Sequence, residues 1–218
     1  MIRKVAGIYF SPVGGTASMI ETLAARIASG LNECSPEGIT TESYDLLSME
    51  DAELQFDEET IAVIGMPVYV GKAPLPGIDS LNRIRANGTM AVIAVSYGGR
   101  TYGNALYELQ HHAEENGFKV IGAGAFGIRY KNRGIFHRSP AGRMDSDRMN
   151  SFCNAAAAKI KRLAGCEIDG LRIKPAPVEV AGKMPVHRIT KLSPRAAAAA
   201  QGVLERLSLI HRESEWYL

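Results

Sequence analysis

The chain has 218 residues, of which 46% are hydrophobic and 22% charged, and its formal net charge at pH 7 is +2. These values are typical of a globular protein, and the length suits one domain of about 150–170 residues followed by an extension. The three cysteines, Cys34, Cys153 and Cys166, lack Cys-x-x-Cys spacing, which excludes a zinc ribbon and an iron–sulfur cluster. No secretory signal precedes the first apolar run, so we expect a cytoplasmic protein with reduced thiols and no membrane-spanning segment.

Short apolar runs alternate with segments of helical periodicity along the first 163 residues. Strands are expected at residues 5–10, 39–46, 61–66, 90–95 and 118–123, and helices at 16–31, 75–84, 102–116 and 146–163. The acidic residues 50–59 are expected to form an exposed connection. Five strands that alternate with helices predict an α/β fold with a doubly wound parallel sheet covered on both faces. In such a sheet, ligands bind beyond the carboxyl ends of the strands.

The first expected strand is followed by Ser11-Pro12-Val13-Gly14-Gly15-Thr16-Ala17, at the start of a helix. Glycine lets the backbone bend close to a ligand, and the free N–H groups and dipole of a helix N-terminus favour an anion. We therefore expect a phosphate site in this loop, and a plain strand-to-helix turn is the alternative.

Two further glycine-rich loops follow the third and fourth expected strands. They are Met66-Pro67-Val68-Tyr69-Val70-Gly71-Lys72-Ala73-Pro74 and Ser96-Tyr97-Gly98-Gly99-Arg100-Thr101-Tyr102-Gly103-Asn104. Because tyrosine can stack on a flat ring, Tyr69 and either Tyr97 or Tyr102 could flank a planar heterocycle whose phosphate lies on the first loop. Ordinary packing or surface roles are the alternative for each tyrosine, but three such loops at one sheet edge favour a ligand site.

These loops resemble those of the flavodoxin-like family. Ser11-Pro12-Val13-Gly14-Gly15-Thr16 is similar to the family's Ser/Thr-x-Thr-Gly-x-Thr phosphate loop, with Val13 in place of a hydroxyl residue. Residues 3–163 resemble the flavodoxin domain of bacterial flavodoxin–ferredoxin fusion proteins, most clearly at residues 9–11, 66–69, 97–106 and 117–126. The resemblance implies the strand order 2-1-3-4-5 and a non-covalently bound FMN. The residues that it implies around the FMN are Ser11, Val13, Gly14, Gly15, Thr16, Ala17, Pro67, Val68, Tyr69, Val70, Gly71, Ser96, Tyr97, Gly98, Gly99, Tyr102, Gly103 and Asn104.

The C-terminal part of the chain departs from the fusion proteins. Those proteins continue into a ferredoxin-like module with Cys-x-x-Cys-x-x-Cys runs, which this chain lacks. Lys191-Leu192-Ser193-Pro194-Arg195-Ala196 looks like the approach to that module, but it leads into an alanine-rich stretch and a short helix expected to end at Trp216-Tyr217-Leu218. We therefore expect a flavodoxin-like FMN-binding domain at residues 1–165 and a C-terminal extension at 166–218, extended over 174–185 and helical over 194–212.

The resemblance implies a redox protein in which the flavin supplies the chemistry, with no metal site and no catalytic protein side chain. Without an iron–sulfur cluster in the chain, the second electron centre must lie on another molecule. Two versions stay open: an electron carrier for a partner ferredoxin or reductase, and an NAD(P)H-dependent quinone or flavin reductase that uses a small acceptor. A flavin-free interaction module on the same fold is a third possibility, favoured by Val13 and Ala17.

The small net charge hides an asymmetry. Residues 1–100 contain 7 Lys and Arg against 12 Asp and Glu, whereas residues 101–218 contain 18 against 11. Much of the basic excess lies in residues 129–148, directly after the fifth expected strand. We expect Arg129, Arg133 and Arg138 to line the mouth of the flavin site and to attract an anionic ligand or an acidic partner, with a solvated loop as the alternative. A basic patch without interleaved aromatic residues does not predict nucleic-acid binding.

Overall fold

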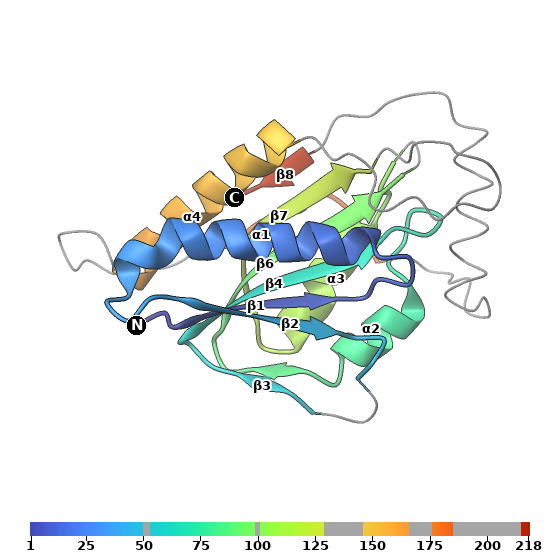
Figure 1. Ribbon diagram of the computed structural model, residues 1–218. Coiled ribbons are helices and arrows are strands. Elements are labelled where there is room, and N and C mark those ends of the chain that lie inside the picture. The colour runs from blue at the N-terminus through green and yellow to red at the C-terminus, as the bar shows by residue number, and fades with distance from the viewer. Residues whose placement is uncertain (50–52, 99–100, 129–145, 166–175, 185–214) are drawn as a thin grey trace.

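The computed structural model describes six parts of the chain: residues 1–49, 53–98, 101–128, 146–165, 176–184 and 215–218 (Figure 1). The regular elements in these parts are β1 (Lys4–Tyr9), α1 (Gly15–Leu31), a short 3₁₀ turn (Asn32–Cys34), β2 (Thr40–Asp45), β3 (Gln55–Phe56), β4 (Thr60–Pro67), α2 (Leu75–Leu81), β5 (Arg85–Ala86), β6 (Met90–Tyr97), α3 (Ala105–Glu115), β7 (Lys119–Gly127), α4 (Ser146–Ala164) and β8 (Glu215–Tyr217). Among the described residues, no helix combines the length and the apolar character that a bilayer crossing requires.

The main sheet has the strand order β2-β1-β4-β6-β7-β8, and its first five strands are parallel. Counted along the chain, the five parallel strands stand in the order 2-1-3-4-5, so the predicted doubly wound α/β fold is confirmed. The chain order reverses between β1 and β4. The helices that follow these strands, α1 and α2, pack on opposite faces of the sheet. This switch point is the place where a doubly wound sheet opens a crevice for a ligand.

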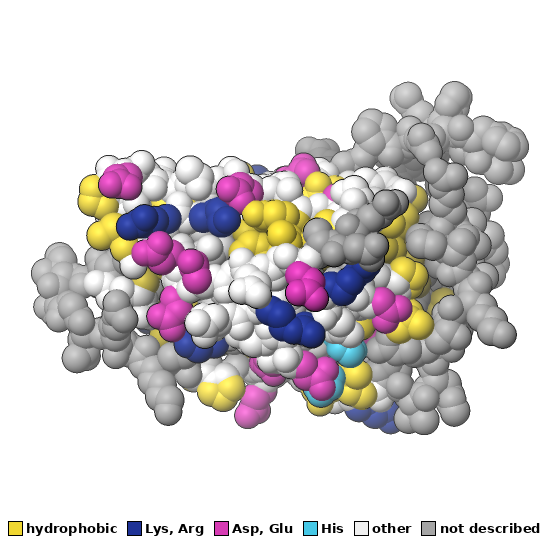
Figure 2. Space-filling model, turned by 90° about the horizontal axis from the view of Figure 1, so that it is seen from below, with side chains coloured by type: hydrophobic (Ala, Val, Ile, Leu, Met, Phe, Trp, Pro, Cys, Tyr) yellow, Lys and Arg dark blue, Asp and Glu magenta, His cyan; other side chains and the backbone are white. Residues whose placement is uncertain are grey.

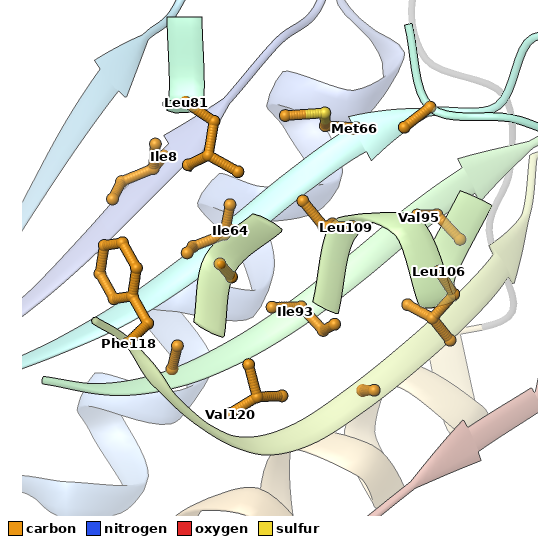
Figure 3. Packing of buried hydrophobic residues seen from close by; sticks show 14 of the residues in the cluster. Ile8, Ile64, Met66, Leu81, Ile93, Val95, Leu106, Leu109, Phe118 and Val120 are labelled. Atoms are coloured by element: carbon orange, nitrogen blue, oxygen red, sulfur yellow. The ribbon is translucent and has the colours of Figure 1, made fainter. Parts of the chain in front are cut away.

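Alternate residues of the central strands face two separate hydrophobic clusters. On β4, Ile61 and Val63 pack with α1 and α4 on one face, whereas Ala62 and Ile64 pack with α2 and α3 on the other. Figure 3 shows the second cluster, in which side chains of the central strands meet Leu81 of α2 and two leucines of α3. Because both faces are covered, the strands are apolar at nearly every position, and this is the pattern that predicted them.

The edge of the sheet beyond β7 differs from the prediction. A sixth strand, β8, runs antiparallel to β7, with Tyr217 opposite Ala123 and Trp216 opposite Gly124. The expectation of a five-stranded sheet was therefore incomplete, and the short helix expected to end at residues 216–218 was wrong for these residues. Aromatic side chains favour strands, and the free N–H and C=O groups along β7 offered a template for pairing.

The described residues 53–59 of the acidic connection are mostly exposed, as expected, but one of them is buried. They include β3, which pairs with β5 in a separate two-stranded parallel sheet. Phe56 is buried there, and its ring lies 5.5 Å from that of Tyr44 and 6.3 Å from that of Phe118, measured between centroids. Phe56, a single aromatic residue among acidic ones, therefore holds this part of the connection against Tyr44 and Phe118.

Residues 176–184 of the expected C-terminal extension lie against α3 and form neither helix nor strand. Val178 and Val180 are buried in the same cluster as α3, and Gln110 Nε2 donates a hydrogen bond of 2.6 Å to the Val178 carbonyl. The helix expected at 194–212 lies outside the described residues. The expected division into a domain at 1–165 and an extension at 166–218 stays a prediction, but residues of the second part contribute to the core of the first.

The N-terminal half of α1 packs unusually close to the sheet. A Cβ atom on Gly65 would collide with the Ile20 side chain, and one on Gly7 would lie 3.3 Å from Ile20 Cγ2. Tyr9, at the end of β1, donates a hydrogen bond of 3.0 Å to Glu21 Oε1 on the same helix. Close packing and this hydrogen bond together hold the beginning of α1 beside the carboxyl end of β1.

The Tyr9 hydroxyl predicts a pH dependence of stability. Burial, reinforced by the hydrogen bond to Glu21, raises the pKa of Tyr9 from 10.0 to about 12. Between these values the unfolded chain loses the tyrosine proton while the folded chain keeps it. The stability contributed by the Tyr9 proton is therefore complete below about pH 10 and is lost as the pH rises towards about 12.

We expect the free energy of unfolding of the unsubstituted protein to fall more steeply over this range than that of Tyr9→Phe, which has no phenol to ionise. Urea unfolding of both proteins from about pH 8 to about pH 12 measures the difference, and other titrating groups cancel in it. Two parallel pH profiles would contradict this account of Tyr9.

Candidate functional site

Three loops lie at the carboxyl ends of neighbouring parallel strands, at the switch point of the sheet (Figure 1). They follow β1 (residues 10–14), β4 (residues 68–74) and β6 (residues 98–104). In the third loop, Gly99 and Arg100 lie outside the described residues. The topology alone thus brings together the three loops that the sequence singled out.

The first loop bends into α1 through Gly14, whose φ of 84° is left-handed and suits glycine. A Cβ atom there would have open space around it. Ser11 Oγ accepts a hydrogen bond of 2.9 Å from the Ala17 N–H, and its own proton can still be donated. The N–H groups of Gly15 and Thr16 meet no acceptor in the described part of the chain. The loop therefore presents free backbone donors at the beginning of a 17-residue helix.

A buried hydrogen bond joins this loop to β6. Thr16 Oγ1 and Ser96 Oγ lie 2.7 Å apart, and the two residues are 3% and 4% exposed. The Ser96 carbonyl in turn accepts a hydrogen bond of 2.9 Å from the Val68 N–H, at the start of the second loop. Ser96 therefore connects the helix start on one side with the second loop on the other.

The second loop closes a tight turn around Val70 and Gly71. Tyr69 and Lys72 exchange two backbone hydrogen bonds of 2.9 and 3.1 Å, and both central residues have positive φ, 53° for Val70 and 74° for Gly71. These are the φ signs of a type I′ turn, which asparagine and glycine usually occupy. A β-branched residue with positive φ is strained, and Val70 is also half exposed. Strain of this kind often occurs at functional sites.

The second and third loops touch through their backbones. The Asn104 N–H donates a hydrogen bond of 2.8 Å to the Gly71 carbonyl, and Gly103 has a φ of 55°. A Cβ atom on Gly103 would lie 2.7 Å from Gly71 Cα, which leaves room for hydrogen only. Gly103 is thus required by the close approach of the two loops, whereas a Cβ atom on Gly71 would lie an ordinary 3.5 Å from Gly103 Cα and Gly71 is favoured by its positive φ of 74°.

Glu108 is a residue of this region that the sequence analysis did not single out. It is fully buried on α3, and its Oε2 atom accepts a hydrogen bond of 3.0 Å from the Ala73 N–H. This contact fixes the end of the second loop to the helix that follows the third. A single carboxylate beside Leu109 carries no motif, and only its position on the buried helix face could have drawn attention to it.

The three tyrosines expected to flank a ring have different environments. Tyr97 is only 3% exposed, and its ring centroid lies 5.8 Å from that of Tyr102. Tyr69 and Tyr102 are half-buried and retain accessible surface. Of the two options for the second flank, Tyr102 is therefore the better placed, and Tyr97 supports its ring from below the surface.

The remaining expected site residues belong to the same loops. Pro67, Val68 and Gly15 are buried; Ala17, Gly98 and Asn104 are half-buried; Val13 is 60% exposed at the tip of the first loop. A contact of each of these residues with a ligand stays a prediction. The basic residues Arg129, Arg133 and Arg138 lie outside the described residues.

Comparisons with known proteins extend only to the fold. No family model matches the chain, and no curated protein sequence matches it. An oxidoreductase structure from Corynebacterium diphtheriae is similar with a TM-score of 0.50 and 12% identity, over 77% of this chain and 99% of that one. Oxidised flavodoxin 1 from Bacillus cereus has a TM-score of 0.47 and 19% identity, over 72% of this chain and 95% of that one. A Fusobacterium nucleatum flavodoxin bound to flavin mononucleotide has a TM-score of 0.45 and 14% identity, over 73% and 98%. At these identities the likeness concerns the fold, which is flavodoxin-like by its strand order.

The contact between Gly71 and Gly103 predicts a large effect of one added methyl group. Gly103→Ala must accept a left-handed backbone and also push the two loops apart, so we expect it to lower the free energy of unfolding by about 2–4 kcal/mol. Gly38 is the matched control, because it has a φ of 81° with nothing within 4 Å of an added Cβ. For Gly38→Ala only the backbone cost of about 1–2 kcal/mol remains. Chemical unfolding of the two variants measures the difference, and equal losses would show that the loops are not held in contact.

Proposed function

We propose that this protein binds FMN non-covalently across the three loops and transfers electrons between that flavin and a partner. The observation that supports this most is the pair of N–H groups at Gly15 and Thr16 that find no acceptor among the described residues, at the start of a long helix and beside two loops with partly exposed tyrosines. One end of this arrangement suits an anion and the other suits a flat, partly apolar ring, which are the two ends of FMN.

The phosphate end would be held mainly by the backbone. A phosphate group at Gly15 and Thr16 would accept hydrogen bonds from the free N–H groups and would gain from the positive end of the α1 dipole. Ser11 can add its hydroxyl proton. Ala17 contributes differently from the sequence expectation, because its N–H already binds Ser11 Oγ and thereby shapes the loop. The absence of hydroxyls at Val13 and Ala17 is then compatible with phosphate binding, since the backbone provides the donors.

The ring end would lie between residues 68–71 and 101–104. Tyr69 and Tyr102 are half-buried and retain accessible surface for stacking, and the turn at Val70 and Gly71 lies against the third loop through Gly103 and Asn104. The flavin, when bound, supplies one- and two-electron chemistry. The protein's part is to orient the ring and to exclude water from one side of it. The backbone contact between Gly71 and Gly103 and the hydrogen bond from the Asn104 N–H to the Gly71 carbonyl join the two walls of this part of the site.

The proposal also concerns where a redox partner binds. The face of the molecule seen in Figure 2 has acidic and basic side chains interspersed over its described part. Such a surface presents no field of a single sign. We therefore assign partner recognition to the edge of the sheet where the three loops lie, and a ferredoxin, a reductase or a small acceptor remain the candidate partners.

Titration with FMN tests the proposed site. We expect the purified protein, freed of flavin, to bind FMN with one saturable site, and Thr16→Val to weaken binding about tenfold, because the Thr16 hydroxyl fixes the helix start against Ser96. Thr22→Val is the matched control: its hydroxyl, on the same helix, donates a hydrogen bond of 2.7 Å to the Ser18 carbonyl away from the loops. Quenching of flavin fluorescence measures both affinities. A protein that does not bind FMN would refute the proposal.

Redox assays of the FMN-loaded protein then distinguish an electron carrier from an NAD(P)H-dependent reductase. Oxidation of NAD(P)H by this protein alone, with a quinone as acceptor, would establish the reductase. Reduction only through a ferredoxin or a separate reductase would establish the carrier, which is the version proposed here. A protein that binds no flavin, yet retains a stable fold, would favour the interaction module instead.

A further inference from the structure

The C-terminal strand β8 places two aromatic residues on opposite faces of the sheet. Trp216 lies beside Phe152 of α4, with 6.2 Å between ring centroids, on the α1 and α4 side. Tyr217 packs with the cluster of α2 and α3 on the other side. Successive residues of a strand alternate in this way, so pairing with β7 at Ala123 and Gly124 determines where each side chain lies.

Tyr217 reaches the third loop of the candidate site. Its hydroxyl lies 3.2 Å from the hydroxyl of Tyr102, a hydrogen bond between residues 115 positions apart in the chain. Both tyrosines are half-buried. Among the described residues, Tyr102 is held by the ring of Tyr97 on one side and by Tyr217 at its hydroxyl.

A second C-terminal segment contacts the same loop. The Lys183 N–H donates a hydrogen bond of 3.3 Å to Asn104 Oδ1, two residues after Tyr102. Beside it, a Cβ atom on Gly182 would lie 2.6 Å from Tyr107 Cβ, so the backbone of this segment runs directly against α3. The conformation of residues 101–104 thus depends on contacts from two separate parts of the chain beyond α4.

We propose that Tyr217 is a positioning residue for the flavin ring and acts through Tyr102. This inference rests on the proposed function. A half-buried tyrosine loses rotational freedom when a ligand stacks on it, which weakens binding unless the ring is already fixed. The hydrogen bond to Tyr217 fixes the Tyr102 ring before the ligand arrives. Tyr217 thereby affects the affinity and the environment of the cofactor through another residue, Tyr102.

The test compares Tyr217→Phe with the unsubstituted protein, because phenylalanine keeps the ring and removes only the hydroxyl. We expect FMN to bind about three- to tenfold more weakly to Tyr217→Phe, as the loss of one hydrogen bond predicts. The visible circular dichroism of the bound flavin should also change, since it reports how the ring is held. Tyr44→Phe is the control: Tyr44 is a half-buried tyrosine whose hydroxyl donates to Glu42 on β2, at the opposite edge of the sheet. It should leave both quantities unchanged.

A double substitution separates positioning from general stability. In a Tyr102→Phe background the partner hydroxyl is absent, so adding Tyr217→Phe should change FMN affinity no further. Additive losses, or a Tyr217→Phe protein with unchanged affinity and flavin dichroism, would overturn this inference alone. Failure of the unsubstituted protein to bind FMN would overturn the proposed function, and this inference with it.

Discussion

The buried hydrogen bond between Thr16 and Ser96 is the contact on which the candidate site depends most. It joins the first residues of α1, which follows β1, to the end of β6, which is separated from β1 in the sheet by β4. One of the two hydroxyls donates to the other at a buried position, so loss of either leaves a buried polar group without this partner. Because the Ser96 carbonyl also binds the Val68 N–H, one residue at the end of β6 sets the position of two loops.

Glycine at close contacts provides the second constraint. Gly7 and Gly65 let α1 approach the sheet closely enough for its N-terminus to lie beside the end of β1. Gly103 lets the third loop touch the backbone of the second loop at Gly71. The sequence shows these glycines as loop or strand residues, but their purpose is visible only when the facing backbone or side chain is known. The glycines at these contacts therefore allow close packing, and they affect a ligand through that packing.

The parallel sheet was predictable because its strands are buried on both faces and appear as continuous apolar runs. Strand β8 was not, since three residues have no periodicity of their own and their pairing depends on the distant edge of β7. The start of α3 was placed at residue 102 and lies at Ala105, because the Asn104 N–H binds Gly71 across the site rather than lying within the helix. The three loops of the site could be identified from the sequence. The burial of Tyr97 and the roles of Glu108 and Tyr217 could not, because they depend on contacts between residues far apart in the chain.

A crystal structure of the protein grown with FMN tests the central claim most directly. The account predicts the phosphate within hydrogen-bond distance of the Gly15 and Thr16 N–H groups, and the ring between residues 68–71 and 101–104 with the Thr16–Ser96 bond retained. FMN bound with its phosphate elsewhere on the protein, or a helix start that moves away from Ser96 when the flavin binds, would contradict the account.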